Sequence, residues 1–361
     1  MYGPFQHLWE DVRQRLSPPM LLHGGHHGPS EFVQPADIQR VLQRFEHEMA
    51  KFGAALCTTP LSELASLLPA RDSLFDVYMA VLATLSAIRD SANAGPTLSD
   101  DLQTWGGSLT SAIQDLIGIA EQQTDLDSTP DRNRKIAVAV GVVLDRCKKL
   151  TKVPLNNSVS VKRHILSCFA TVKDAQRELM GEVSRQRELE GNGQQGGEDD
   201  MNSHEEGGEA GNGSDDAELD SCDDMMEEDT MTPQQLDVAE KVAELLTSTR
   251  ELLKETLHAL TKGVTAEGSC DGDRVQQLEQ LGRHCEDVAA RVDEAVQATY
   301  PPQELAHLDA IVSRMASSMG QISQGLHEAC EVPQDLSSFQ SYQTSIQTFH
   351  AFLAAQGDAS T

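Results

Sequence analysis

Apolar side chains recur every three or four residues along most of the chain, which is the spacing of one face of an α-helix. Proline and glycine residues interrupt this pattern and mark the ends of the helices. The pattern predicts nine amphipathic helices, which cover residues 37–56, 74–88, 99–120, 130–147, 161–190, 233–260, 275–295, 305–326 and 336–353. Ser99 is the predicted N-cap of the third. A shorter helix is predicted over residues 5–16, ahead of a Gly- and His-rich linker.

Helices that cannot bury their apolar faces alone, and that are joined by short connections, pack most economically as antiparallel bundles. We therefore predict an all-α protein made of two up-and-down helical bundles joined by a disordered acidic linker. The predicted domains are an N-terminal helix with the Gly/His linker over 1–36, a five-helix bundle over 37–190, the acidic linker over 191–232, and a four-helix bundle over 233–357.

The acidic linker breaks every helical pattern in the chain. Residues 191–231 contain fifteen Asp or Glu, no Lys or Arg, and many glycines. Such a segment cannot bury enough apolar surface to offset the entropy of ordering, so it is predicted to be disordered and to act as a soluble spacer. Ser203 and Ser221 each have an acidic residue three positions later, which suits acid-directed kinases and makes them candidate phosphorylation sites.

Composition agrees with a helical, acidic protein. Aromatic residues make up only 4% of the chain, whereas sheet proteins use more aromatic and β-branched residues. The net charge of −29 opposes attraction to nucleic acid and to anionic lipid. The seven cysteines are scattered without CxxC spacing, which indicates reduced thiols in the cytosol or nucleus. No signal peptide or long apolar run is visible, so we expect a soluble intracellular protein without membrane insertion.

No residue pattern indicates catalysis, a cofactor or a metal. Phosphate-binding, hydrolase, zinc-protease, calcium-loop and kinase motifs are all missing from the sequence. His284 and Cys285 are adjacent on a predicted helix and so do not face each other, which favours a packed cysteine over a catalytic pair. His23, His26 and His27 lack a fourth ligand, and a solvated linker is the favoured interpretation. We predict no catalytic, cofactor-binding or metal-binding residues.

Two patterns are typical of transcription factors, and neither predicts direct DNA binding. The helices between Arg134 and Met180 could form a helix-loop-helix, but the dense basic region that reads DNA is missing before them. Basic residues cluster around the intervening loop instead, and a solvated face is the favoured interpretation; they are Lys148, Lys149, Lys152, Lys162 and Arg163. Leucines 246, 253 and 260 repeat at seven, but this seam is short, so bundle core is favoured over a leucine zipper.

The order of these parts resembles the Grap- and cyclin-D-interacting protein family. Local matches are Phe45–Phe52, the Val172-Lys173-Asp174-Ala175 segment with Glu178 and Met180, and Tyr300-Pro301-Pro302. The resemblance extends from about Phe5 to Phe352. It implies bundles similar to those of talin and vinculin, and a regulator without enzymatic activity. The implied partners are D-type cyclins, helix-loop-helix transcription factors and the signalling adaptor Grap, in the cytoplasm and nucleus.

A second class of function stays open at this point. Talin-like bundles also occur in cytoskeletal and trafficking adaptors, which would make the protein an actin-binding or membrane-binding module. Such a module should carry a basic face or a basic C-terminal helix. The last predicted helix contains no Lys or Arg, which favours the regulatory hypothesis.

Overall fold

The computed structural model describes residues 35–59, 61–90, 94–122, 130–193, 231–263, 272–330 and 337–359. Over this part of the chain the structure is helical and contains no β-strand, which confirms the predicted all-α fold class. Helical parts stand on both sides of residues 194–230, as predicted. The predicted helix over 5–16, the Gly/His linker and nearly all of the acidic linker lie outside the described residues.

Packing divides the described residues into two units. Unit 1 contains residues 35–164 and 272–279, and unit 2 contains residues 165–263 and 280–359. Most of the helix that ends the predicted first domain therefore packs in unit 2, so packing does not follow the predicted grouping of five helices and four. That 37–190 and 233–357 fold as independent domains stays a prediction, as does their likeness to talin and vinculin.

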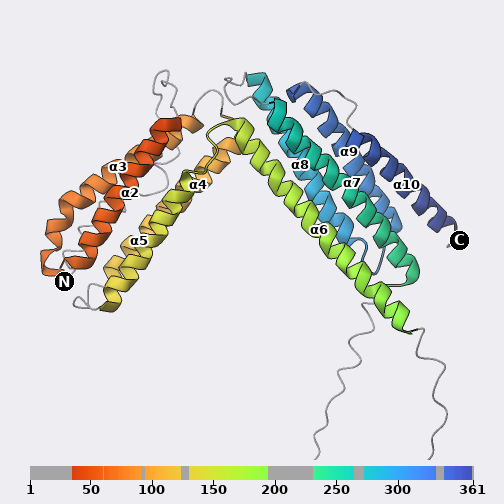
Figure 1. Cartoon of the computed structure of the whole chain (residues 1–361), viewed down its shortest axis with the longest axis horizontal. Coiled ribbons are helices and arrows are strands. Elements are labelled where there is room, and N and C mark those ends of the chain that lie inside the picture. The colour runs from red at the N-terminus through yellow and green to blue at the C-terminus, as the bar shows by residue number, and fades with distance from the viewer. Residues whose placement is uncertain are drawn as a thin grey trace, which may run out of the picture. The chain divides into compact units, whose positions relative to one another are not determined.

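Unit 1 is built on four helices, drawn from red to yellow in Figure 1. They are α2 (Pro35–Thr58), α3 (Leu68–Arg89), α4 (Pro96–Gln122) and α5 (Pro130–Leu150). A 3₁₀-helix, η2 (Leu61–Leu67), leads into α3, which begins six residues before the predicted start at residue 74. The first turns of α6 (Asn157–Gly193) and of α8 (Gly272–Gln297) complete the unit.

The four helices close into a ring, because α2 packs against α3 and α5, and α4 packs against the same two. Their order is up-and-down. The Cys57 thiol at the end of α2 reaches the Asn133 carbonyl at the start of α5 (3.7 Å), and the Cys147 thiol near the end of α5 reaches the Leu42 carbonyl (3.7 Å). These crossed pairs require α2 and α5 to run antiparallel.

Aromatic and polar side chains connect α3 to its two neighbours in the ring, α2 and α4. The Phe45 ring of α2 lies 6.3 Å from the Tyr78 ring of α3. The Tyr78 hydroxyl is 2.6 Å from the Thr110 hydroxyl of α4, so a buried polar group finds a partner within the core. Burial raises the pKa of Tyr78 to about 12, although the hydrogen bond to Thr110 opposes this shift.

The predicted N-cap of α4 is wrong. The helix begins at Pro96, and the Ser99 amide donates to the Gly95 carbonyl (3.0 Å), so Ser99 lies inside the first turn. The capping acceptor comes from another helix. The Thr97 hydroxyl donates to the buried Glu279 carboxylate of α8 (2.6 Å), and the Thr97 amide is 3.2 Å from the same group. A carboxylate at a helix N-terminus satisfies free amides there, and such a distant partner is invisible in local sequence.

Unit 2 contains the rest of α6 and α8 together with α7 (Pro233–Gly263), α9 (Leu305–Cys330) and α10 (Ser337–Ala359). Helix α10 packs against α7 and α9. The Arg187 guanidinium of α6 binds Asp237 (2.6 Å) and Glu240 (3.0 Å) of α7, so the end of α6 lies beside the start of α7. The Asp309 carboxylate of α9 is 2.7 Å from His350 of α10.

The leucine repeat of α7 belongs to the core of unit 2. Leu246, Leu253 and Leu260 are all buried. Thr249 and Thr256 are buried too, and each donates its hydroxyl to the carbonyl four residues earlier (2.9 Å). Threonine satisfies itself in this way inside a helix, so it can sit in an apolar seam. The interpretation as bundle core rather than leucine zipper is confirmed.

Candidate interaction surfaces

Several sites considered from the sequence lie outside the described residues. They are the candidate phosphorylation sites Ser203 and Ser221, and the histidines at 23, 26 and 27. Among the residues that the structure describes, no group of His, Cys, Asp or Glu side chains is arranged to hold a metal ion. In the same residues, no helix is both long enough and apolar enough to cross a bilayer.

His284 and Cys285 do not form a reactive pair. The Cys285 side chain is fully buried in unit 2, whereas His284 is half-buried beside it. Burial raises the pKa of the Cys285 thiol well above its ordinary value, and the nearby Cys168 thiol raises it further. A nucleophilic cysteine needs a lowered pKa, so this environment is typical of a packed cysteine. The interpretation of Cys285 as a packed residue is confirmed.

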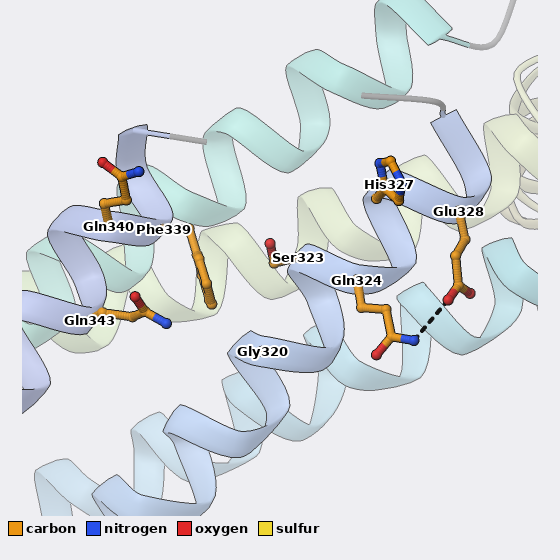
Figure 2. A pocket seen from close by; sticks show the side chains of 8 residues that line it. All are labelled: Gly320, Ser323, Gln324, His327, Glu328, Phe339, Gln340 and Gln343. Atoms are coloured by element: carbon orange, nitrogen blue, oxygen red, sulfur yellow. Dashed lines mark hydrogen bonds between the residues drawn. The ribbon is translucent and has the colours of Figure 1, made fainter. Parts of the chain in front are cut away.

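A groove lies between α9 and α10 in unit 2. Its volume is about 490 Å³, and it is lined by Gly320, Ser323, Gln324, His327, Glu328, Phe339, Gln340 and Gln343. Figure 2 shows the Phe339 side chain extending from α10, and the Gln324 amide hydrogen-bonded to Glu328 (2.8 Å). Ligand sites are predominantly apolar with a few placed polar groups. Apart from Phe339 and Gly320 the lining residues are polar or charged, so the groove lacks the predominantly apolar lining typical of ligand sites.

The solvent-facing side of α5 offers a different kind of surface. Val138 is 61% exposed and Val142 is 44% exposed, and they lie one helical turn apart. Ala137 and Gly141 are exposed beside them. Among the described residues, these valines form the only pair of exposed large apolar side chains separated by one turn. We call Ala137, Val138, Gly141 and Val142 the outer face of α5.

Basic residues stand at both ends of the outer face. Between Asp131 and Lys152 the sequence has seven Lys or Arg and only two acidic residues, in a chain whose net charge is −29. Arg134 and Lys135 are exposed before the valines, and Lys148 and Lys149 are exposed after them. Both acidic residues are paired along the helix, Asp131 with Lys135 (3.1 Å) and Asp145 with Lys149 (2.8 Å).

The five basic residues that the sequence groups around the loop after α5 lie in unit 1. Lys152 and Arg163 are exposed with Lys148 and Lys149, and Lys162 is half-buried. The Arg163 guanidinium lies 5.5 Å from the centre of the Trp105 ring of α4, a cation–π distance. The outer valines are not part of the predicted apolar stripe of α5, so the sequence prediction did not include them. Their position opposite Ile136 and Val143 was the signal that could have found them.

Two family models match this chain. The model described as Grap2 and cyclin-D-interacting, N-terminal, matches residues 37–185, and the corresponding C-terminal model matches residues 212–324. The chain belongs to the Grap2 and cyclin-D-interacting family. This confirms the resemblance inferred from the order of helices and linker. A comparison with curated proteins found no match.

Membership in the Grap2 and cyclin-D-interacting family supports a role in protein–protein interaction. The match to the N-terminal model includes α2 to α5 and most of α6, so the outer face of α5 lies within the family region. Helix α10, which lines one side of the groove, lies beyond the match to the C-terminal model. The outer face is therefore the better candidate for a surface that serves the family's role.

Proposed function

We propose that this protein is a non-enzymatic regulator that binds D-type cyclins and helix-loop-helix transcription factors, and thereby restrains cell-cycle progression and transcription. It acts in the cytoplasm and nucleus, with a signalling adaptor of the Grap class as a further partner. The observation that carries this proposal is the family match across both helical parts of the chain.

The described surface supports binding rather than chemistry. Enzymatic sites combine a concave pocket with titratable groups of perturbed pKa. In the part of the chain that the structure describes, the strongly shifted cysteine and tyrosine pKa values belong to buried core residues such as Tyr78, Cys147 and Cys285. An exposed apolar face with charged ends, as on α5, is typical of a protein-binding surface.

The competing hypothesis is a cytoskeletal or trafficking adaptor. Actin-binding and membrane-binding bundles need a basic face to meet an acidic surface. Helix α10 has no Lys or Arg, which speaks against a basic C-terminal helix of that kind. The basic residues of α5 flank an apolar centre, an arrangement that a protein helix with acidic ends can match.

A binding titration tests the proposal. Purified full-length protein is titrated against a D-type cyclin, in parallel with a variant whose residues 196–228 are replaced by a short Gly/Ser linker. A short linker suffices because Arg187 binds Asp237 and Glu240, which holds the end of α6 beside the start of α7. We expect saturable binding at micromolar affinity or tighter in both proteins, because the surface we favour is on a folded helix.

Two other outcomes have clear meanings. Binding lost only in the linker variant would assign the contact to the acidic segment instead of a helical surface. No binding of cyclin by either protein would contradict the proposal, and co-sedimentation with actin filaments and anionic vesicles would then test the adaptor hypothesis.

A further inference from the structure

The buried face of α5 is already occupied. Ile136, Val143 and Cys147 are fully buried in the core of unit 1. Val140 packs so closely against α2 that a Cβ added at Gly53 would lie 2.8 Å from both of its γ-carbons. A partner that paired with this face, as one helix-loop-helix protein pairs with another, would first have to open the bundle. A contact that α5 makes while unit 1 stays folded therefore has to use the outer face.

The outer face is built from residues that do not favour an isolated helix. Valine loses side-chain freedom in a helix, and glycine is about 1 kcal/mol less favourable than alanine at an interior position. A Cβ added at Gly141 would meet nothing within 4 Å, so packing among the described residues does not require glycine there. The described residues of unit 1 leave these valines exposed and this glycine uncrowded. Valines beside a glycine on the surface of a helix allow a second helix to pack close against it.

The charges flanking the outer face indicate which kind of partner helix could bind there. Arg134 and Lys135 precede the valines, and Lys148 and Lys149 follow them, one or two turns away. A second copy of this chain would bring its own basic ends against these, which disfavours self-association. A basic partner helix would be repelled for the same reason. A helix with acidic ends and an apolar centre is complementary along its whole length.

We infer that the outer face of α5 is a docking surface for an amphipathic helix of a partner protein, with an apolar seam over Val138 and Val142 and acidic residues opposite the basic ends. The inference rests on the proposed function for the identity of the partner, and it names the surface and the chemistry that the partner presents. The contact leaves the bundle of α2 to α5 closed.

A pair of synthetic peptides tests the surface without any cyclin. The first peptide, of about 20 residues so that it can form a helix, carries a leucine seam flanked by glutamates. The second has lysine at every glutamate position. Full-length protein is titrated with each. We expect saturable binding of the acidic peptide, weakened by added salt because charge contributes, and much weaker binding of the lysine peptide. Equal binding of the two, or no saturation by the acidic peptide at millimolar concentration, overturns the inference.

Substitutions locate the contact. The double variant Val138→Gln with Val142→Gln removes the apolar seam, and the matched control is Leu166→Gln with Met180→Gln, whose side chains are 54% and 52% exposed on α6. Glutamine is a better helix former than valine, so the α5 variant should unfold at the same temperature as the native protein or higher. We expect it to bind the acidic peptide roughly tenfold more weakly or worse, with the control unchanged. Equal affinity of both variants overturns the inference.

The same variants separate this inference from the proposed function. A D-type cyclin that binds the native protein and the α6 control, and fails to bind the α5 variant, supports both. A cyclin that binds all three equally overturns the assignment of the outer face, and the proposed function stands. A cyclin that binds none of them contradicts the proposed function, and the peptide titrations then decide the inference by themselves.

Discussion

The two faces of α5 use the same residue types for opposite purposes. On the inner face, Val140 and Val143 are buried, and Val140 fits against Gly53 of α2. On the outer face, Val138 and Val142 are exposed beside Gly141, which nothing crowds. Composition does not distinguish the faces. What differs is whether another helix of the same chain covers them.

This difference shows why residue type alone is a weak guide to function in a helical bundle. A valine that faces the core contributes stability through burial, at about 25 cal/mol per Å² of apolar area. A valine that faces solvent contributes almost nothing to stability and lowers helix propensity. Apolar residues on the second kind of face therefore call for an explanation outside the folded unit.

Truncating the inner face should have the largest effect on stability. Ile136→Ala removes a fully buried side chain, and we expect a loss of about 2–5 kcal/mol in the free energy of unfolding. Val138→Ala, two residues away, should change it by about 0.5 kcal/mol or less. Urea unfolding followed by circular dichroism measures both. Comparable losses at the two positions would show that the outer face is also packed.

Adding a methyl group at Gly53 should have the next largest effect. Gly53→Ala places its Cβ against the γ-carbons of Val140, whose β-branched side chain cannot turn aside easily. Overpacking costs about 1–3 kcal/mol, and the gain in helix propensity of about 1 kcal/mol offsets part of it. We expect a net loss in urea unfolding.

A double-mutant cycle shows whether the cause at Gly53 is the predicted contact. Val140→Ala removes the γ-carbons that the new methyl group meets, so Gly53→Ala should cost less in the Val140→Ala background. An identical loss in both backgrounds would place the strain elsewhere in the α2–α5 contact.

Much of this fold could be predicted from the spacing of apolar residues. The ends of α5 and the start of α7 follow from Pro130, Pro154 and Pro233, because proline fixes helix boundaries locally. The start of α4 carries the same signal at Pro96, which the prediction of Ser99 as N-cap overlooked. The capping acceptor could not be predicted, since Glu279 supplies it from far along the chain. The packing of most of α6 in unit 2 also depends on distant residues, such as the partners of Arg187 on α7.

The candidate surface was harder to predict than the fold. Sequence reasoning located the basic residues Lys148, Lys149 and Lys152, and interpreted them as a solvated face. Their meaning changes once Val138 and Val142 are known to be exposed next to them. A helical wheel places these valines opposite the buried stripe, but it does not show how far each side chain is exposed. Burial by α2 decides between the two sides.

A change from glycine to alanine at Gly141 should stabilise the protein, whereas the same change at Gly53 should destabilise it. Gly141→Ala adds a methyl group into open space and improves helix propensity, so we expect a gain of about 0.5–1 kcal/mol in the free energy of unfolding. Gly107→Ala on α4 is the matched control, because its Cβ also meets nothing within 4 Å. Both variants should unfold at higher urea concentration than the native protein. A loss at Gly141 but not at Gly107 would reveal packing on the outer face.

The smallest expected effect concerns the acidic residue within the basic end of the outer face. The Lys149 ammonium lies 2.8 Å from the Asp145 carboxylate and lowers its pKa. A lowered pKa stabilises the fold above the ordinary pKa of aspartate, and that contribution disappears as the pH falls through the lowered value. Because the pair is fully exposed, added salt should move the pKa of Asp145 back toward its ordinary value, which carboxylate NMR can follow.

Asp145→Asn should leave stability nearly unchanged and should free Lys149 for an acidic partner. We expect it to bind the acidic peptide roughly twofold more tightly at low salt, with no gain at high salt. Weaker binding at low salt would mean that removing the Asp145 carboxylate does not strengthen attraction to the glutamates of the peptide, which would contradict an acidic contact at this end of α5.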